Sequence, residues 1–450
     1  MKPASFLTLG VVAISVNFVV PFAASCHSGA GGDTSGSASS GASTGTVLPA
    51  GGYCSLPGSI RFVNGSQDIV PGGVGAANLK FLKLPDGFCA HYFGNVGNAR
   101  QIRFAPGGEL FVASPTKGTT GGCGTCGPFC PVCGKAAIFV LPDDNNDGLA
   151  DAPVTFLDSL PATQGLMFAP GFFYYQDATR VMKIPYTKGD RKPSGAAQAV
   201  VDITYYSSNT HWPKTFDMAD DGTIYIGNGG DQTETCDPTH PFHGGVLKID
   251  GSAGGAQVAK GFRNPINIRC SHGHNLCFAL ELAKDYTTTD GGREKMVPIR
   301  EGDDWGFPCC ATKDLAYPGS PPGTNCGSMT PENVGFLIGD TPFALAFVPS
   351  TWPAPYQNHA LVGTHGAAGT WTGARVVSVA LDAATGLPLP GTNTSGINSG
   401  SMADFATGWD DGSLAHGRPA AFDFAADGRL FIASDADGTI FWIAPIGTGA

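Results

Sequence analysis

Polar side chains stand directly before recurring hairpin motifs of this chain, and their types suit proton transfer and the binding of negative charge. His211 suits a general base, because a neutral imidazole accepts a proton near neutral pH. Arg263 and Arg418 suit the neutralisation of charge that builds up on a bound group. Each also has a structural alternative: a hydrogen-bonded histidine, or an arginine in an ion pair between neighbouring elements. The other polar residues that precede the motifs are Arg100, Gln101, Gln164, Lys214, Asn264 and His416.

Oxygen-bearing side chains also recur with the spacing of a calcium-binding loop. They occupy positions 1, 3, 5 and 9 of a segment that has glycine at position 6 and valine, instead of a bidentate glutamate, at position 12. The segment lies between two strand-like runs, so an acidic hairpin turn is the alternative. A calcium ion bound here would be structural, because the loop has no reactive neighbours. The predicted ligands are Asp143, Asn145, Asp147 and Asp151.

The first residues predict export. An apolar run from Phe6 to Ala24 follows Lys2 and ends in Ala-Ala-Ser-Cys, which resembles a bacterial lipoprotein cleavage site. We therefore predict a signal peptide over 1–25, a lipid anchor on Cys26 and a periplasmic, outer-membrane or cell-surface location, with plain secretory cleavage as the alternative. Residues 26–55 are predicted to be a flexible tether rich in Ser and Gly, and 56–450 a folded domain.

The chain has 13 cysteines. Without Cys26 their number is even, which in an exported chain predicts disulfides. The run of four from Cys123 to Cys133 has the spacing CxxCxxxCxxC. Local disulfides are favoured there over a zinc or iron–sulfur site. Because no CxxC is followed by His, the chain carries no c-type haem motif.

The composition narrows the fold class. Only 14% of the 450 residues are charged, against about 25% in an average domain, while 65 are Gly and 34 are Pro. This excludes a long-helix protein, and the 42% of hydrophobic residues argues against wholesale disorder. The net charge is −11 without any basic cluster, so nucleic-acid binding is excluded as a function class.

The elements that position the polar residues are predicted by a repeat. IRFAPGGELFV begins at residue 102, FDMADDGTIYI at 216 and FDFAADGRLFI at 422. Each copy reads as strand, Asp-Gly or Gly-Gly turn, and second strand. Weaker copies begin at Leu166, Ile266 and Leu345.

Six hairpin units, spaced 50 to 79 residues apart, predict an all-β, six-bladed β-propeller, since four-stranded blades take about 40–50 residues plus insertions. A β-sandwich would not explain sixfold recurrence of one turn. The last blade is predicted to pair the segment 87–94 with the C-terminal run 440–443.

Six segments, in order, resemble the soluble glucose/sorbosone dehydrogenases that depend on pyrroloquinoline quinone (PQQ). The resemblance spans roughly residues 80 to 444. It implies a propeller that oxidises a sugar or related alcohol or aldehyde, with PQQ and Ca²⁺ at one end of the channel. The segments are LPDGFCAHYFGNVGNARQIRFAPGGELFVAS (84–114), HWPKTFDMADDGTIYIGNG (211–229), GFRNPINI (261–268), REGDDWGFPCC (300–310), ALVGTHGAAGTWTGARVVSVALD (360–382) and HGRPAAFDFAADGRLFIASD (416–435).

The resemblance also implies roles for single residues. It makes His211 the general base, and it makes Arg263 a catalytic residue that also binds the cofactor. Asn264, Arg418 and Gln164 match cofactor-binding positions, and the pair Asp231 and Gln232 matches a segment near the sugar pocket. In this scheme hydride passes to PQQ, Ca²⁺ acts as Lewis acid, and a separate carrier accepts the electrons.

The chain departs from the family in two blades. Glu281-Leu282-Ala283-Lys284-Asp285 stands where members often have an Asn-Glu-Arg-Asp-like segment, and only His365 lies near a cofactor-contacting Lys or Arg of blade five. These departures favour an alternative function, a non-catalytic, surface-anchored propeller that binds a glycan or a partner protein. A calcium-dependent lactonase would need more carboxylate or Asn ligands at the channel than the sequence offers.

Overall fold

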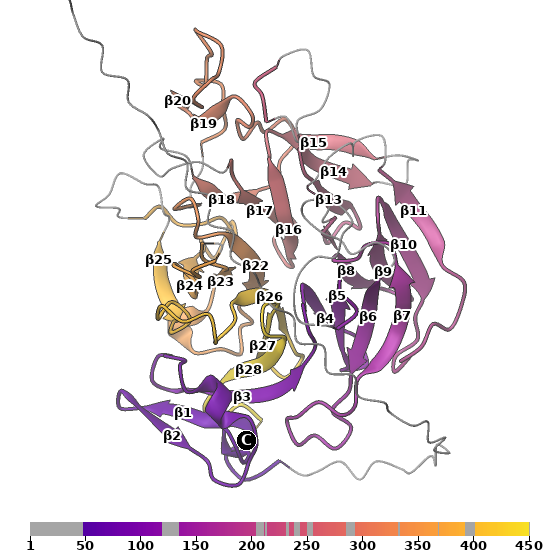
Figure 1. Ribbon diagram of the computed structural model, residues 1–450, viewed down its shortest axis with the longest axis vertical. Coiled ribbons are helices and arrows are strands. Elements are labelled where there is room, and N and C mark those ends of the chain that lie inside the picture. Colours follow the sequence, from indigo (N-terminus) through magenta and orange to yellow (C-terminus); the bar gives the residue numbers. More distant parts are fainter. Residues whose placement is uncertain are drawn as a thin grey trace, which may run out of the picture. The chain divides into compact units, whose positions relative to one another are not determined.

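In the computed structural model, the described residues are 48–118, 135–203, 211, 214–230, 234–237, 244–249, 255–284, 293–331, 334–367, 369–391 and 401–449. These residues form six antiparallel sheets arranged around a common centre (Figure 1). The prediction of an all-β, six-bladed propeller is confirmed. Regular helix in the described part is limited to short 3-10 turns at η1 (Tyr53–Ser55), η2 (Ala76–Leu79) and η5 (Ala354–Tyr356). No helix in the ranges above is long and apolar enough to span a membrane.

The first three blades follow one another along the chain, each as a four-stranded meander. The first blade consists of β4 (Gln101–Phe104), β5 (Leu110–Ser114), β6 (Ala136–Leu141) and β7 (Val154–Leu160). The second consists of β8 (Leu166–Ala169), β9 (Phe172–Asp177), β10 (Arg180–Pro185) and β11 (Gln198–Asp202). The third consists of β12 (Phe216–Met218), β13 (Ile224–Asn228), β14 (Gly245–Ile249) and β15 (Ala256–Lys260).

The fourth blade carries an insertion, which contains the separate hairpin β19–β20, and the sixth blade uses both ends of the chain. The fourth blade consists of β16 (Asn264–Ser271), β17 (Leu276–Leu282), β18 (Glu294–Pro298) and β21 (Val334–Phe336), with β19 (Cys310–Thr312) and β20 (Leu315–Ala316) in the insertion. The fifth consists of β22 (Pro342–Phe347), β23 (His359–Thr364), β24 (Arg375–Ala380) and β25 (Met402–Ala406). The sixth consists of β26 (Pro419–Phe424), β27 (Leu430–Ser434), β28 (Thr439–Pro445), β3 (Phe88–Asn95), β1 (Ile60–Val63) and β2 (Ser66–Ile69).

The repeated turn has the same structure in its three strong copies. Gly108, Gly222 and Gly428 all have φ between 87° and 102°, a backbone conformation that glycine adopts without the steric cost of a Cβ. Each donates its amide to the residue three positions earlier, and that residue donates to the position just after the glycine. Local turn chemistry therefore explains why the motif recurs as a hairpin.

The first strand of each blade lies at the centre of the molecule. Each of these innermost strands contacts that of the next blade, in the ring β4, β8, β12, β16, β22, β26 and back to β4. Six hydrophobic clusters fill the spaces between neighbouring blades, one at each interface. The core is thus a ring of interfaces around a channel.

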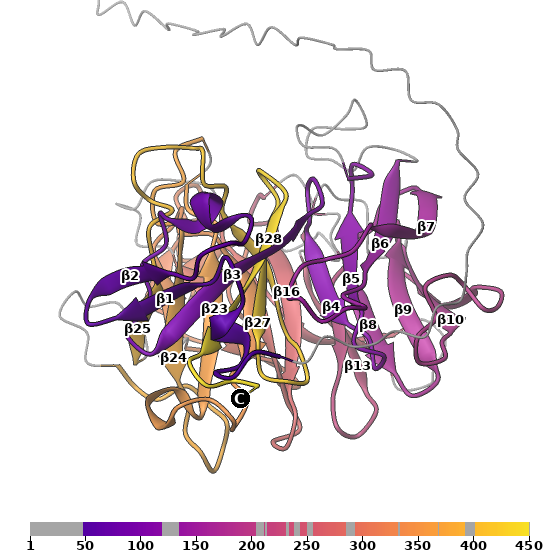
Figure 2. The ribbon, with the colours of Figure 1, turned by 90° about the horizontal axis from the view of Figure 1, so that it is seen from below.

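The ring closes where β3 pairs antiparallel with β28, with Ala90 opposite Ile443. In Figure 2, β3 in indigo crosses beside the yellow strands β27 and β28. The predicted closure by 87–94 and 440–443 is confirmed. A disulfide joins Cys89 on β3 to Cys54 in η1. The chain therefore packs on the propeller from Tyr53 onward, slightly before residue 56 where the sequence placed the start of the domain.

Four disulfides occur among the described residues, and they confirm the prediction of disulfide bonding in general. Besides Cys54–Cys89 they are Cys236–Cys309, Cys270–Cys277 and Cys310–Cys326. The run from Cys123 to Cys133, Cys26 and the predicted signal peptide lie outside the described residues.

We expect the Cys54–Cys89 disulfide to contribute more stability than Cys270–Cys277. The first spans 35 residues and the second 7, and a longer loop loses more entropy in the unfolded chain when it is cross-linked. Replacing Cys54 and Cys89 by Ala should cost roughly 3–4 kcal/mol of unfolding free energy, and the matched Ala pair at Cys270 and Cys277 about 2 kcal/mol. Urea denaturation of both variants measures the difference; equal losses would contradict the prediction.

Candidate active site

The polar residues singled out in the sequence gather at one end of the channel. Gln164 precedes β8, Lys214 precedes β12, Asn264 begins β16 and Arg418 precedes β26. The beginnings of neighbouring innermost strands lie next to each other: Gly165, just before β8, packs against the carbonyl of Lys214, just before β12. Ends are likewise joined to ends, as where the Phe104 amide donates to Asp423. The strands therefore run in one direction; we call the end where they begin the proximal end, and the other the distal end.

His211 is held in one tautomer. Its Nδ1 lies 2.9 Å from the carbonyl oxygen of Gly230, and because a carbonyl only accepts, Nδ1 carries the proton and Nε2 keeps a lone pair. Burial, followed by the nearby charge of Arg263, lowers the pKa of His211 to about 4. Gly229 makes room for this packing, since a Cβ there would lie 2.2 Å from that of His211. The imidazole is thus neutral at physiological pH.

Arg263 is fixed on both its backbone and its side chain. Its backbone amide donates to Glu281 Oε1 at 2.7 Å, and its Nε forms an ion pair with Glu234. Lys284 Nζ donates to the Glu234 carbonyl at 3.0 Å. Burial raises the pKa of Glu281 to about 7, against the attraction of Lys295, which stands directly opposite it on β18. The guanidinium of Arg263 therefore lies beside His211 in a fixed position.

Lys214 is a buried amine to which the sequence assigned no role. It is 1% exposed, and its Nζ donates to the carbonyl of His211 at 3.1 Å. Burial lowers the pKa of Lys214 to about 7, so the amine changes charge in the physiological range. In the sequence, only its position between His211 and the strand that begins at Phe216 pointed to this lysine, and that position did not distinguish it from a surface lysine.

A second group of charges joins blades 1, 5 and 6. Arg418 forms a bidentate ion pair with Asp435, at 2.8 and 3.0 Å, and Arg100 Nε lies 3.0 Å from the same carboxylate. His365 Nε2 lies 3.6 Å from Asp435, and its ring stacks on Phe343. Burial raises the pKa of Asp435, but the histidine and the two arginines outweigh it and hold this pKa well below its usual range. Two guanidinium groups thus share one carboxylate, which leaves a positive surplus.

Two predicted cofactor-binding amides have buried oxygens with no partner among the described residues. They are Gln164 Oε1 and Asn264 Oδ1, in side chains that are 1% and 8% exposed. A buried acceptor without a donor is costly. An N–H donor or a hard cation such as Ca²⁺ is the kind of partner that would satisfy each oxygen. Asp231 and Gln232, the predicted substrate contacts, lie outside the described residues.

The 143–151 loop lies between β6 and β7, away from this group. Asp143 accepts the amides of Asp147 and Gly148, and Asp151 accepts the amide of Asp144. Burial raises the pKa of Asp143 to about 6. Across the ranges that the structure describes, no three His, Cys, Asp or Glu side chains converge as a metal site. Calcium in this loop stays a prediction.

The comparison with solved structures supports the propeller fold. One family model matches residues 76–279, less than half of the chain, and is described as a domain of unknown function (DUF7133). No curated protein matches the sequence. Solved structures match over most of their length and about four fifths of this chain. The chain has the propeller fold of soluble sugar dehydrogenases.

Three of these structures illustrate the likeness. The calcium structure of the Family AA12 carbohydrate-active enzyme from Trichoderma reesei has a TM-score of 0.64 and 18% identity, covering 81% of this chain and 97% of its own. The PQQ domain of pyranose dehydrogenase from Coprinopsis cinerea has a TM-score of 0.60 and 14% identity, and the match covers 80% of this chain and 96% of that domain. The soluble aldose sugar dehydrogenase from Escherichia coli has a TM-score of 0.54 and 12% identity, and the match covers 80% of this chain and 99% of that enzyme.

We expect Arg263→Gln to raise the pKa of His211. Removing the guanidinium abolishes one of the two main causes of the low value, while burial keeps the pKa below the usual 6.5. The matched control Arg263→Lys keeps the positive charge and should leave the pKa near 4. A pH titration of histidine-labelled protein by NMR measures both. An unchanged pKa in Arg263→Gln would show that burial alone sets it.

Lys214→Met should stabilise the protein more at pH 6 than at pH 10. Since the folded pKa of about 7 lies below the ordinary 10.5, the native state is destabilised below pH 7 and regains stability as pH rises toward 10.5. Methionine removes this penalty, so its melting temperature should exceed that of the wild type by several degrees at pH 6. Thermal unfolding at the two pH values measures this. A variant that melts lower at both would mean that the amine is balanced by a partner.

Proposed function

We propose that this protein is a PQQ-dependent dehydrogenase that oxidises a sugar or a related alcohol or aldehyde, with His211 as general base. The observation that carries the proposal is the tautomer of His211: Nδ1–H donates to the carbonyl of Gly230, and Nε2 keeps a lone pair that can accept a proton. Such an imidazole can remove the hydroxyl proton of a substrate while hydride leaves the same carbon. Solved structures of this fold named as sugar dehydrogenases or as a PQQ domain support it.

The charges at the proximal end fit a planar group that carries several carboxylates. Arg100 and Arg418 share only Asp435, and Lys214 is buried beside His211. Aromatic rings back both arginines, with Arg418 4.3 Å from the Trp371 centroid. These cations would hold the carboxylates of PQQ, with Arg263 beside the reacting oxygen. When bound, PQQ would supply the acceptor for the hydride.

The remaining parts of the proposal rest on the sequence. Ca²⁺ would serve as Lewis acid at the proximal end, where Gln164 Oε1 and Asn264 Oδ1 offer oxygen ligands. Asp231 and Gln232 would contact the sugar, and a separate carrier would take up the electrons. Export, with a lipid anchor on Cys26, would place the enzyme in the periplasm or at the cell surface.

The test is dye reduction by the full chain supplied with PQQ and Ca²⁺, over a panel of aldoses and alcohols. We expect turnover with at least one substrate. His211→Ala should lose activity by roughly a hundredfold or more, the usual worth of a general base, while PQQ binding followed by absorbance stays largely intact. Added imidazole should restore part of the rate. Because the folded pKa of His211 is about 4, the rate should fall only as pH drops through that value.

The matched control is His91→Gln. His91 is another buried histidine, which stacks on Trp442 within blade six and lies outside the proximal end. It should keep the wild-type rate per folded molecule. Retained activity in His211→Ala would remove His211 from its role. PQQ binding without turnover on any substrate would favour the non-catalytic alternative, and absence of PQQ binding would overturn the proposal.

A further inference from the structure

The insertion of blade four is hydrogen-bonded to the segment that leads into Arg263. The amide of Trp305 donates to the carbonyl of Lys260 at 2.9 Å, and the amide of Phe307 donates to that of Gly261 at 2.9 Å. Trp305 is 1% exposed and packs in the hydrophobic cluster between blades three and four. The beginning of the insertion therefore has a fixed position relative to the backbone of Arg263, while its hairpin β19–β20 lies outside the six sheets (Figure 1).

A disulfide connects the same insertion to the partner of the Arg263 side chain. Cys309, two residues after Phe307, is bonded to Cys236, which lies 73 positions earlier in the chain. Cys236 follows Glu234 by two residues, and Glu234 forms the ion pair with Arg263 Nε. The insertion thus contacts the approach to Arg263 through hydrogen bonds, and the segment that carries its ion-pair partner through a covalent bond.

Glu234 has a backbone conformation that needs support from its surroundings. Its φ is 46°, in the left-handed region that residues with a Cβ seldom occupy. Such a conformation persists where neighbouring contacts hold it. Lys284 Nζ donates to the Glu234 carbonyl at 3.0 Å and lies 5.5 Å from the ring centroid of Tyr317 in the insertion. The disulfide at Cys236 is a second support, and its loss would allow Glu234 to relax away from Arg263.

The position of Arg263 bears directly on His211. The Arg263 carbonyl accepts the amide of Gly230 at 2.6 Å, and the Gly230 carbonyl accepts Nδ1–H of His211 at 2.9 Å. Burial is the main cause of the low pKa of His211; the Arg263 guanidinium lowers this pKa further, and the Glu234 carboxylate raises it. A displacement of Glu234 therefore changes the charges that face the proposed general base.

The Cys236–Cys309 disulfide is more accessible than the other three disulfides that the structure describes. Both of its cysteines are partly exposed, whereas no cysteine of the other three is more than 6% exposed. Thiol–disulfide exchange requires that an attacking thiolate reach one of the two sulfurs. A dithiol reductant should therefore open Cys236–Cys309 before the others.

We propose that Glu234 is the positioning residue of Arg263 and that the Cys236–Cys309 disulfide holds it in place, so that reduction by a dithiol loosens the proposed active site. In that step the S–S bond breaks, and Cys236 and Cys309 become thiols. The dithiol supplies the two electrons and two protons through a mixed disulfide and itself becomes a disulfide. The catalytic consequence rests on the proposed dehydrogenase function, whereas the positioning of Arg263 does not.

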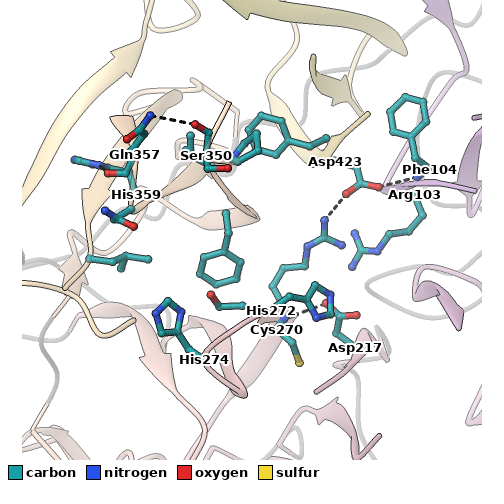
Figure 3. Close-up of a pocket in the computed structure, with 18 of the residues that line it drawn as sticks. Arg103, Phe104, Asp217, Cys270, His272, His274, Ser350, Gln357, His359 and Asp423 are labelled. Carbon is teal, nitrogen blue, oxygen red and sulfur yellow. Dashed lines mark hydrogen bonds and ion pairs between the residues drawn. The ribbon is translucent and has the colours of Figure 1, made fainter. Parts of the chain in front are cut away.

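A second disulfide of blade four provides a matched control. Cys270–Cys277 joins β16 to β17 at the distal end of the channel. Cys270 lines a cavity of about 640 Å³ there, together with Arg103 and Asp423 (Figure 3). Since a strand rises about 3.3 Å per residue, Cys270 lies roughly 20 Å along β16 from Asn264. Removing this disulfide leaves the surroundings of Arg263 unchanged, so Cys270→Ser/Cys277→Ser is the control variant.

The first test identifies the disulfide that a dithiol reaches in the folded full chain. Brief treatment with dithiothreitol, followed by alkylation and peptide mass spectrometry, shows which cysteines have been released. We expect Cys236 and Cys309 to be alkylated before the cysteines of the other three described disulfides. Equal or earlier alkylation of those cysteines would overturn the redox part of the proposal.

The second test follows the Nε–H signal of Arg263 in ¹H–¹⁵N NMR spectra of arginine-labelled protein, assigned by its loss in Arg263→Lys. This hydrogen donates to Glu234 and should exchange slowly with water. Cys236→Ser/Cys309→Ser should speed its exchange at least about tenfold. The partially reduced wild type should do the same, which keeps the test valid if the variant does not fold. Unchanged exchange, or equal acceleration in the control variant, would overturn the proposal.

Glu234→Ala tests the route by which the disulfide acts. It keeps the disulfide but removes the acceptor, so the Nε–H of Arg263 should exchange as fast as in the variant without Cys236–Cys309. Removing the disulfide from Glu234→Ala as well should add nothing, because the disulfide acts through Glu234. A further acceleration would overturn that route. Glu301→Ala, which removes an exposed partner of Lys248, should exchange as the wild type does.

Turnover separates this inference from the proposed function. Reduction should lower kcat of the PQQ-loaded enzyme at least about tenfold, since a misplacement of about 1 Å can cost a hundredfold, and reoxidation should restore it. A kcat that survives loss of the disulfide would overturn the catalytic consequence. If no form of the protein turns over a substrate, the proposed function fails, while the exchange rates of Arg263 still decide whether Glu234 positions it.

Discussion

The pairing of β3 with β28 is the constraint on which the rest of the structure depends. It joins the two ends of the folded chain within one blade and so closes the ring of six innermost strands. Only in a closed ring do the starts of these strands meet, which brings residues as distant in sequence as Arg100 and Arg418 onto the single carboxylate of Asp435. The same closure brings Asp423 against the end of β4. Both ends of the channel are therefore products of one strand pairing.

Although the chain has few charged residues, several of them are buried, and burial changes their pKa values. At the proximal end, burial pushes the pKa values of His211, Lys214 and Glu281 toward or past the physiological range, in the direction of the neutral form. At the distal end, the same effect acts on Arg103. Each group is held by a hydrogen bond to a backbone group of a neighbouring residue. The channel thus holds these polar groups in fixed positions in a medium of low dielectric, the setting in which electrostatic interactions are strongest.

Much of the fold could be predicted from the sequence, because the repeated turn depends on neighbouring residues alone: the glycine at 108, 222 and 428 has positive φ in every copy. The gathering of His211, Arg263, Asn264 and Arg418 at one end of the channel followed from their places before the innermost strands. The partners of these residues could not be predicted. Asp435 lies after β27, so its contact with Arg100 depends on closure between blades one and six. The significance of Lys214 and Arg103 is a matter of burial, which a single sequence does not reveal for a charged residue.

Closure also bears on the order in which the chain folds. β3 is synthesised long before β28, so this edge of β3 stays unpaired until β28 has been made. An unpaired edge invites association with other chains. Its other edge, however, pairs with β1, which pairs with β2, and the Cys54–Cys89 disulfide closes within the same N-terminal segment. All these contacts are local in sequence, so a three-stranded, cross-linked unit can form before the blades do, with one edge of β3 free to pair with β28.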